Sequence, residues 1–418
     1  MSAKRPLYGW LTSEAVSITG TRVSMIALPW FVLTTTGSPS KTGLVALAEM
    51  LPLVILKVLG GPIIDRVGAR RVSITCDLLS VLVVGSVPLL YHSGHLSFPG
   101  FLLLVAMAGA LRGPGDSAKH ALIPALVERA GVPLERATGL ASTVERGASM
   151  LGAAFAGGLI SVIGPANALI VDAGSFLLSA VVLAWATVGM GPAASVEGAA
   201  EPPYRQRLAE GWRFLRGDRL LLGIAVMVAL TNFLDIAWAT VLVPVWARDY
   251  GGGAAAIGLL FAVFGAAAVA GAMCAAAWGE RLPRYRTYLI AFLVGGAPRF
   301  AVMAFDSPLW AVLAVAVAGG FAAGFINPIL GAVIYERIPA PLVGRVTSLT
   351  TAMCFALMPL GGLLGGVLVT AWGLPMAMLA IGAAYFLVTM SPAVDPAWRA
   401  MDDRPAPEPP ALVPQHAV

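Results

Sequence analysis

Long apolar segments recur along almost the whole of this 418-residue chain. Each is about 20 residues or longer, which is the length that an α-helix needs to cross the hydrocarbon core of a bilayer. Hydrophobic residues make up 58% of the sequence and charged residues only 12%, a balance that water-soluble domains do not show. The sequence therefore predicts an all-α membrane protein whose main solvent is lipid.

We predict twelve transmembrane helices from the apolar runs between charged residues and Pro or Gly. They cover residues 9–36, 41–63, 72–92, 98–119, 136–163, 166–189, 220–247, 254–279, 287–305, 308–334, 343–371 and 374–391. No small-residue cleavage site follows the first of them, so we expect a retained helix and not a signal peptide.

The positive charges predict the orientation of these helices. Most of the 27 Lys and Arg residues, Lys119 among them, fall on one side of the membrane. By the positive-inside rule this side is the cytoplasm, and both termini lie there. The same loop charge accounts for the net charge of +5, so we expect no nucleic-acid partner. We expect a monomer of the cell inner (plasma) membrane, surrounded by membrane lipids.

An internal repeat divides the chain into two halves. A shift of 215 residues superposes Pro29 on Pro244, Gly43 on Gly258, Asp65 on Glu280, Arg66 on Arg281, Arg71 on Arg286, Ile123-Pro124 on Ile338-Pro339, and Gly147 on Gly362. We predict two pseudo-symmetric six-helix halves, residues 1–190 and 220–392, with a site near mid-membrane between them. Residues 191–219 are the predicted cytoplasmic linker with an amphipathic helix, and residues 393–418 a disordered tail.

The loop at residues 60–71 carries the most specific motif. Its sequence matches the pattern G-x-x-x-D-R-x-G-x-R-R of the major facilitator superfamily, which the chain therefore resembles, through Gly61, Asp65, Arg66, Gly68, Arg70 and Arg71. Glu280 and Arg281 lie at the matching place in the second half. The resemblance implies a conformational-switch loop, whose charge-assisted bonds break when the halves rock apart. Ordinary basic loop charge is the alternative.

Other segments resemble one branch of that superfamily, the bacterial efflux branch with its macrolide-efflux-like, Tap-like multidrug and enterobactin-exporter-like proteins. They are residues 27–38, 122–127, 168–178 and 324–328. Residues 152–158 resemble its antiporter motif, with Ala153 in place of the proline, although close helix packing explains these small residues equally well. The resemblance covers nearly the whole chain apart from the tail. It implies the twelve-helix major facilitator fold and export of amphipathic compounds, often driven by inward proton movement.

Ionisable side chains deep in the predicted helices are candidates for ion coupling, because they are costly in a membrane. The carboxylates are Asp235, Glu49 and Glu145, and the candidate charge partners are Arg22, Arg112 and Arg146. Arg22 is the predicted cavity cation and could balance any of the three carboxylates. Asp235 could instead be a fixed structural pair, and Arg112 could neutralise Glu145. We place Asp77, Asp116 and Lys57 near helix ends, where long side chains reach water.

Polar, aromatic and soft apolar side chains of the predicted helices are candidate substrate contacts. We select Asn232, Asn327, Trp238, Phe233, Phe325 and Trp30. For each aromatic residue of this set, packing against lipid or protein is an equally good explanation.

Enzyme chemistry finds no support in the sequence. The four histidines and three cysteines lack metal-ligand or catalytic spacing, and no Gly-rich phosphate loop is present, so we expect no metal and no cofactor. We predict a secondary transporter that exports amphipathic or hydrophobic small molecules, such as drugs, antibiotics or secondary metabolites, by alternating access with proton antiport. A narrow exporter of a metabolite such as a siderophore, and a non-transporting membrane receptor or scaffold, remain alternatives.

Overall fold

The computed structural model describes residues 4–189, 204–339 and 342–403. Twelve helical segments in these ranges are long and apolar enough to cross a membrane, which confirms the predicted twelve-helix fold. The first half contains α1 (Arg5–Thr36), α2 (Pro39–Leu59), α3 (Gly61–Val67), α4 (Ala69–His92), α5 (Phe98–Ala121), α6 (Ile123–Ala130), α7 (Leu134–Ile163) and α8 (Pro165–Ala186).

The rest of the chain, from α9 onward, is more often interrupted. It contains α9 (Tyr204–Gly217), α10 (Arg219–Ala237), the π-helix η1 (Trp238–Leu242), α11 (Val243–Asp249), α12 (Gly253–Trp278), η2 (Gly279–Arg281), α13 (Arg284–Gly295), α14 (Ala297–Ala304), α15 (Leu309–Ala323), α16 (Ile326–Arg337), α17 (Val343–Ala356), α18 (Met358–Trp372), α19 (Leu374–Met390), η4 (Ser391–Ala393) and η5 (Pro396–Met401).

Prolines account for several of these interruptions. The break at Gly296 lies two residues before Pro298, and the break at Leu357 lies two residues before Pro359. A proline lacks the N–H that would bond to the preceding turn, but it fits the first turn of a new helix at no such cost. One membrane span is therefore built from two consecutive helices at each of these positions.

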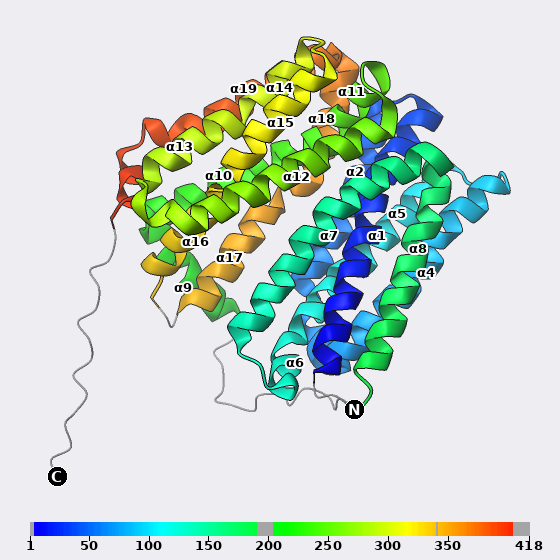
Figure 1. Ribbon diagram of the computed structural model, residues 1–418, viewed down its shortest axis with the longest axis horizontal. Helices are drawn as coiled ribbons and strands as arrows, with labels where there is room; N and C mark the ends of the chain where they lie inside the picture. The colour runs from blue at the N-terminus through cyan, green and yellow to red at the C-terminus, as the bar shows by residue number, and fades with distance from the viewer. Residues whose placement is uncertain (1–3, 190–203, 340–341, 404–418) are drawn as a thin grey trace.

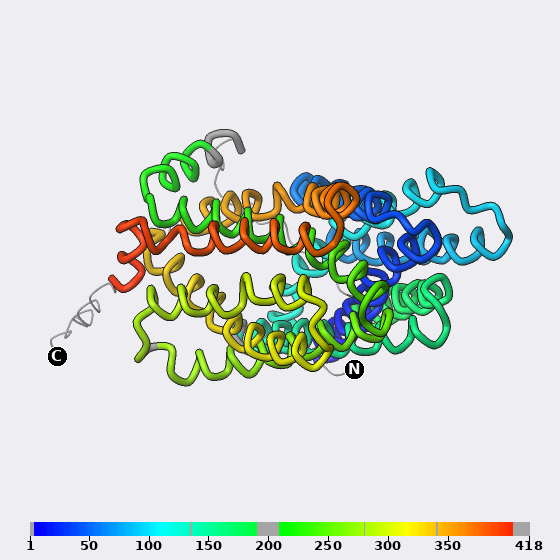
Figure 2. Tube along the Cα trace, turned by 90° about the horizontal axis from the view of Figure 1, so that it is seen from above, coloured from blue at the N-terminus to red at the C-terminus, as the bar shows by residue number. Residues whose placement is uncertain are grey.

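The two halves lie side by side and meet along two helix pairs (Figures 1 and 2). α2 packs along α18, and α7 packs along α12. Glycines allow the close approach, because a Cβ on Gly43 would lie 2.3 Å from the carbonyl oxygen of Gly362, and a Cβ on Gly157 would lie 2.7 Å from the Cα of Gly258. These contacts lie near the ends of the helices that are far from the N-terminus of α1. We call this contact region the glycine seam.

The repeat holds for the backbone, but a single offset does not describe it. α7 ends before Gly164 and α18 ends before Gly373, so these equivalent ends are 209 residues apart and not 215. The predicted pairing of Gly147 with Gly362 is therefore wrong, because the connections before the fifth helix of each half differ in length.

The predicted start of the disordered tail needs correction, whereas no correction applies to the predicted linker. The linker contains the helix α9, on which Leu215 is buried and Trp212 is 42% exposed, whereas residues 190–203 lie outside the described ranges. We expected disorder from residue 393, but Trp398 and Met401 of η5 are buried, and the Trp398 ring stacks on Tyr288 at 5.9 Å. Two large apolar side chains in a short segment order it without any helical periodicity. Residues 404–418 are outside the described ranges.

Candidate functional site

A cavity of about 500 Å³ lies between the two halves, beside the glycine seam. α1 and α7 form its wall in the first half, and η1, α12 and α16 form its wall in the second. Its lining combines charged, polar and apolar side chains: Arg22, Met25, Ile26, Ser142, Glu145, Arg146, Ser149, Met150, Ala153, Ala239, Thr240, Phe261, Gly265, Ala268, Val269 and Asn327. Because Arg22 and Glu145 lie near the middle of their helices, the cavity is at mid-depth.

The α7 wall of this cavity could have been found from the sequence. Its lining residues are Ser142, Glu145, Arg146, Ser149, Met150 and Ala153, which recur at intervals of three and one. This is the spacing of one helical face, and here that face is the polar one in an otherwise apolar segment. Arg22, Met25 and Ile26 repeat the same spacing on α1. The sequence analysis selected single charges and did not follow this stripe.

Three of the predicted charged residues meet at the cavity, namely Arg22, Glu145 and Arg146. The Nη2 atom of Arg22 donates a hydrogen bond to Ser149 Oγ at 2.8 Å. Glu145 is the carboxylate that acts electrostatically on Arg22, but no ion pair within 4.0 Å joins them in the described structure. The cavity thus brings together a carboxylate and two guanidinium groups that are not tied to one another.

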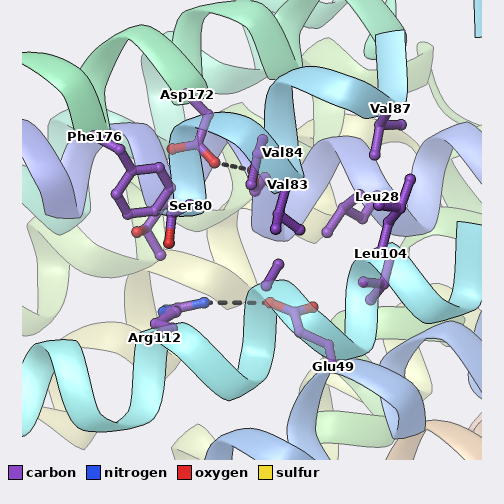
Figure 3. Close-up of a pocket in the computed structure, with 14 residues that line it drawn as sticks. Leu28, Glu49, Ser80, Val83, Val84, Val87, Leu104, Arg112, Asp172 and Phe176 are labelled. Carbon is purple, nitrogen blue, oxygen red and sulfur yellow. Dashed lines mark hydrogen bonds and ion pairs between the residues drawn. The ribbon is translucent and has the colours of Figure 1, made fainter. Parts of the chain in front are cut away.

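Glu49 lies instead inside the first half, in a small pocket of about 30 Å³ (Figure 3). Arg112 of α5 pairs with it, with 3.3 Å between Nη1 and Oε1, so the suggestion that Arg112 neutralises Glu145 is wrong. The hydroxyl of Ser80 faces the same pocket, is buried, and has no hydrogen bond in the described structure. A space of this size, with several polar groups in a largely apolar wall, can hold a water molecule.

Asp172 of α8 is a buried carboxylate that is not among the predicted coupling residues. It lines the small pocket opposite Glu49 and is 1% exposed. Ser24 and Ser175 donate hydrogen bonds to its carboxylate, which satisfies a charge that has no ion-pair partner in the described residues. Its position inside a segment typical of the efflux branch was visible in the sequence, but the sequence did not show that two serines surround it.

Asp235 forms an ion pair with Arg299 of α14. Three aromatic rings surround this guanidinium, with its Cζ 4.6 Å from the ring centre of Trp238 and 4.8 Å from those of Phe300 and Tyr385. Such cation–π contacts stabilise a desolvated cation. The geometry corresponds to the fixed structural pair that the sequence left open for Asp235, with Arg299 and not Arg22 as the partner.

Lys119 and Asp77 form a second pair inside the first half, 3.2 Å apart between Nζ and Oδ2. Their side chains are 2% and 5% exposed. Lys119 also donates hydrogen bonds to Ser17 and Ser179. The prediction that Lys119 is a loop charge is therefore wrong, and so is the prediction that Asp77 lies at a water-exposed helix end. α5 turns directly into α6, and both side chains stay inside the bundle.

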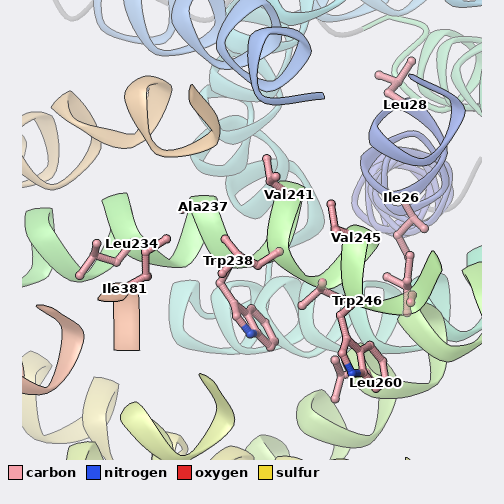
Figure 4. Close-up of a cluster of buried hydrophobic side chains, with 14 of the residues drawn as sticks. Ile26, Leu28, Leu234, Ala237, Trp238, Val241, Val245, Trp246, Leu260 and Ile381 are labelled. Atoms are coloured by element: carbon pink, nitrogen blue, oxygen red, sulfur yellow. The ribbon is translucent and has the colours of Figure 1, made fainter. Parts of the chain in front are cut away.

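Of the six predicted substrate contacts, Asn327 lines the cavity. The others lie elsewhere in this conformation. Trp238 belongs to the buried core of α10, η1 and α11 (Figure 4), Asn232 donates a hydrogen bond to the carbonyl of Cys354, and Phe325 lines a separate pocket beside Arg284. Trp30 and Phe233 pack against the core.

The predicted switch loop lies at the end of the bundle away from the glycine seam. Arg70 donates hydrogen bonds to Thr187 Oγ1 at 2.7 Å and to the carbonyl of Ala184 at 3.1 Å, both within the first half. Asp65 is exposed and has no ion pair in the described structure. Gly61, Arg66, Arg71 and Arg281 are also exposed, Gly68 is half-buried, and the side chain of Glu280 lies outside what the structure describes.

No group of His, Cys, Asp or Glu in the described ranges has the arrangement of a metal site. The charges and the cavity therefore offer ion pairs, hydrogen bonds and apolar walls to a ligand.

Comparisons with known proteins agree with this arrangement. A family described as transmembrane secretion effector (MFS_3) matches residues 7–410. The chain is 31% identical over 414 residues to the multidrug efflux pump Tap of Mycobacterium tuberculosis strain H37Rv, covering 97% of this chain and 96% of the relative. Tap of Mycolicibacterium fortuitum is 29% identical over 400 residues, covering 95% and 96%.

Solved structures show the same fold. The nucleoside transporter NupG, as its D323A mutant, superposes with a TM-score of 0.74 at 12% identity, covering 95% of this chain and 100% of that structure. A bacterial homologue of the human lysosomal transporter Spinster has a TM-score of 0.65 at 15% identity, covering 96% and 98%. The chain is thus a multi-pass plasma-membrane transporter and not an enzyme, and it belongs to the transmembrane secretion effector family of the major facilitator superfamily.

Proposed function

We propose that this protein exports amphipathic or hydrophobic small molecules, such as drugs, antibiotics or secondary metabolites, by alternating access. The cavity of about 500 Å³ carries the proposal, because it lies between the two halves and combines apolar walls with a few polar groups. Pockets of this volume hold drug-sized molecules. The similarity to a relative that is named a multidrug efflux pump, over 97% of the chain, supports export and not uptake.

The glycine seam supports a specific conformational assignment. Gly43 lies near the beginning of α2 and Gly157 near the end of α7, so both contacts are at the end opposite the N-terminus. The positive-inside rule places both termini in the cytoplasm, and the seam then closes the outer side. We infer a state that accepts substrate from the cytoplasm. Export would separate the seam and bring the switch loop, with Asp65, against the second half.

We infer that an inward proton drives export and that Glu145 is the first candidate for the coupling carboxylate. It shares the cavity with the substrate, so binding of a substrate changes its solvation and its charge environment. Glu49 and Asp235 each have an arginine within ion-pair distance, which holds their charge in place, so they are the second candidates. One chain encloses the cavity, and the proposed transporter therefore works as a monomer.

The test is transport into proteoliposomes with an imposed pH gradient, using ethidium and the neutral dye N-phenyl-1-naphthylamine as probes. Glu145→Gln, Glu49→Gln and Asp235→Asn are compared with the intact protein. Asp249→Asn is the matched control, because that carboxylate is exposed and pairs only with the adjacent Arg248 in the described structure. We expect gradient-driven movement of at least one probe, a loss of about tenfold or more for Glu145→Gln, and no change for the control.

Each other outcome changes a defined part of the proposal. Movement that ignores the pH gradient contradicts proton antiport and keeps export. Loss in Glu49→Gln or Asp235→Asn alone moves the coupling site to that residue. If neither probe moves under any gradient, a narrow metabolite exporter or a non-transporting receptor replaces the proposal.

A further inference from the structure

Arg22 is half-buried, and the hydrogen bonds of its guanidinium are incomplete. Its Nη2 donates to Ser149 and its Nη1 approaches the sulfur of Met25 at 3.3 Å. Its Nε is buried and has no hydrogen-bond partner in the described structure. A thioether is a weak acceptor, so only one of the three nitrogens has a strong partner. A guanidinium in such a position is costly unless an anion completes its hydrogen bonds.

The nearby carboxylates are committed elsewhere. Glu49 pairs with Arg112, and Asp172 accepts hydrogen bonds from Ser24 and Ser175. Arg112 also approaches the Met25 sulfur, at 3.9 Å, so a second guanidinium lies on the other side of the same atom and repels Arg22. Glu145 attracts Arg22 but forms no ion pair with it in the described structure. Arg22 therefore has no ion-pair partner among the described residues.

The cavity lining itself carries an excess of positive charge. Arg146 is an exposed second arginine of the lining, and no described residue forms an ion pair with it. The lining thus holds two arginines and one carboxylate. Apolar side chains, among them Ile26, Met150 and Phe261, form surfaces beside these arginines. The positive charge and the apolar surface are open to the same ligand.

We propose that the cavity binds amphipathic organic anions, with Arg22 as the residue that anchors the acidic group. The ligand class is an aromatic or aliphatic body bearing a carboxylate, sulfonate or similar oxyanion. The planar fork of a guanidinium suits two oxygens of such a group. The body of the ligand lies against Met150 and Phe261. This assignment rests on the proposed export function and names its substrate class.

Two fluorescent dyes make a matched pair for the test. 8-Anilino-1-naphthalenesulfonate carries a sulfonate on the ring system of N-phenyl-1-naphthylamine, which is neutral. We measure the affinity of the full chain in lipid nanodiscs for both dyes, and subtract the signal of empty nanodiscs. Arg22→Gln removes the charge, and Arg22→Lys keeps it without the fork. Arg248→Gln, at an exposed position in the last turn of α11, is the control.

For the intact protein we expect tighter binding of the sulfonate than of the neutral dye. Arg22→Gln should weaken sulfonate binding by about tenfold or more, which is the range for a lost charge-assisted bond, and change the neutral dye by less than about twofold. Arg22→Lys should lie between the two, and Arg248→Gln should match the intact protein. A thermal unfolding transition of each variant shows that it is folded. If Arg22→Gln does not fold, Arg22→Lys is used for the test instead.

Equal affinity for the two dyes, or sulfonate binding that survives in both Arg22 variants, overturns the assignment. Failure of the anion site can be distinguished from failure of the export function. Gradient-driven transport of the neutral dye without sulfonate discrimination leaves export intact and removes the anion site. Sulfonate binding that depends on Arg22, without transport of either dye, keeps the anion site and removes export.

Discussion

The two halves share a backbone plan but treat buried charge differently. The first half encloses the pairs Glu49–Arg112 and Asp77–Lys119. The 215-residue offset, which fits the second and third spans of each half, places Phe264 and Phe292 at the positions of Glu49 and Asp77. In the described core of the second half the ion pair is Asp235–Arg299. In the first half, the same offset places Gly20 at the position of Asp235 and Val84 at the position of Arg299. Neither half repeats the charges of the other.

This difference separates two kinds of interior. In the first half Glu49 and Arg112 line a small pocket that also has polar groups, and Lys119 donates hydrogen bonds to two hydroxyl groups. In the second half, aromatic rings hold Arg299 in place on three sides. The two halves therefore surround their buried charges differently, with hydroxyl groups in the first and aromatic rings in the second.

Removing Lys119 should lower the stability of the protein more than any other change considered for the two halves. Lys119→Met leaves the buried Asp77 carboxylate unpaired beside Glu14, which is also buried. Loss of one partner of a buried pair costs about 3–5 kcal/mol of the free energy of unfolding. We expect a large drop in the thermal unfolding temperature in detergent, and recovery of most of it in the double variant Lys119→Met with Asp77→Leu. A drop below about 1 kcal/mol would mean that the first half has no tightly buried pair.

Removing Asp235 should have a smaller effect. The side chain of Asp235 is 38% exposed, and the three rings continue to stabilise Arg299 after Asp235→Asn. We expect a loss of about 1.5–3 kcal/mol, the range for a hydrogen bond to a charged group. Thermal unfolding measures the loss, with Asp249→Asn as the control. A cost as large as that of Lys119→Met would contradict the ranking of the two halves.

The fold was predictable because hydropathy and length fix where helices cross the bilayer. The charge pairs were not, because pairing depends on which helices become neighbours. Arg299 was visible in the sequence, but nothing in it placed α14 against α10. Lys119 was read as a loop charge, because the hydropathy pattern weakens where α5 continues into α6. The cavity was half predictable: Arg22, Glu145 and Asn327 were selected, whereas the apolar lining needed the fold.

The smallest expected effect concerns the hydroxyl of Ser80. It faces the small pocket between Glu49 and Asp172 and is 3% exposed (Figure 3). If a water molecule joins it to these carboxylates, Ser80→Ala removes one hydrogen bond of that water and costs about 0.5–1.5 kcal/mol. Val83→Ala in the same wall removes only apolar volume and should cost a similar amount of the free energy of unfolding.

The two variants should differ in transport. We expect slower gradient-driven export for Ser80→Ala and an unchanged rate for Val83→Ala. Equal rates would mean that the pocket has no part in moving protons, and the first half would then differ from the second in its stability alone.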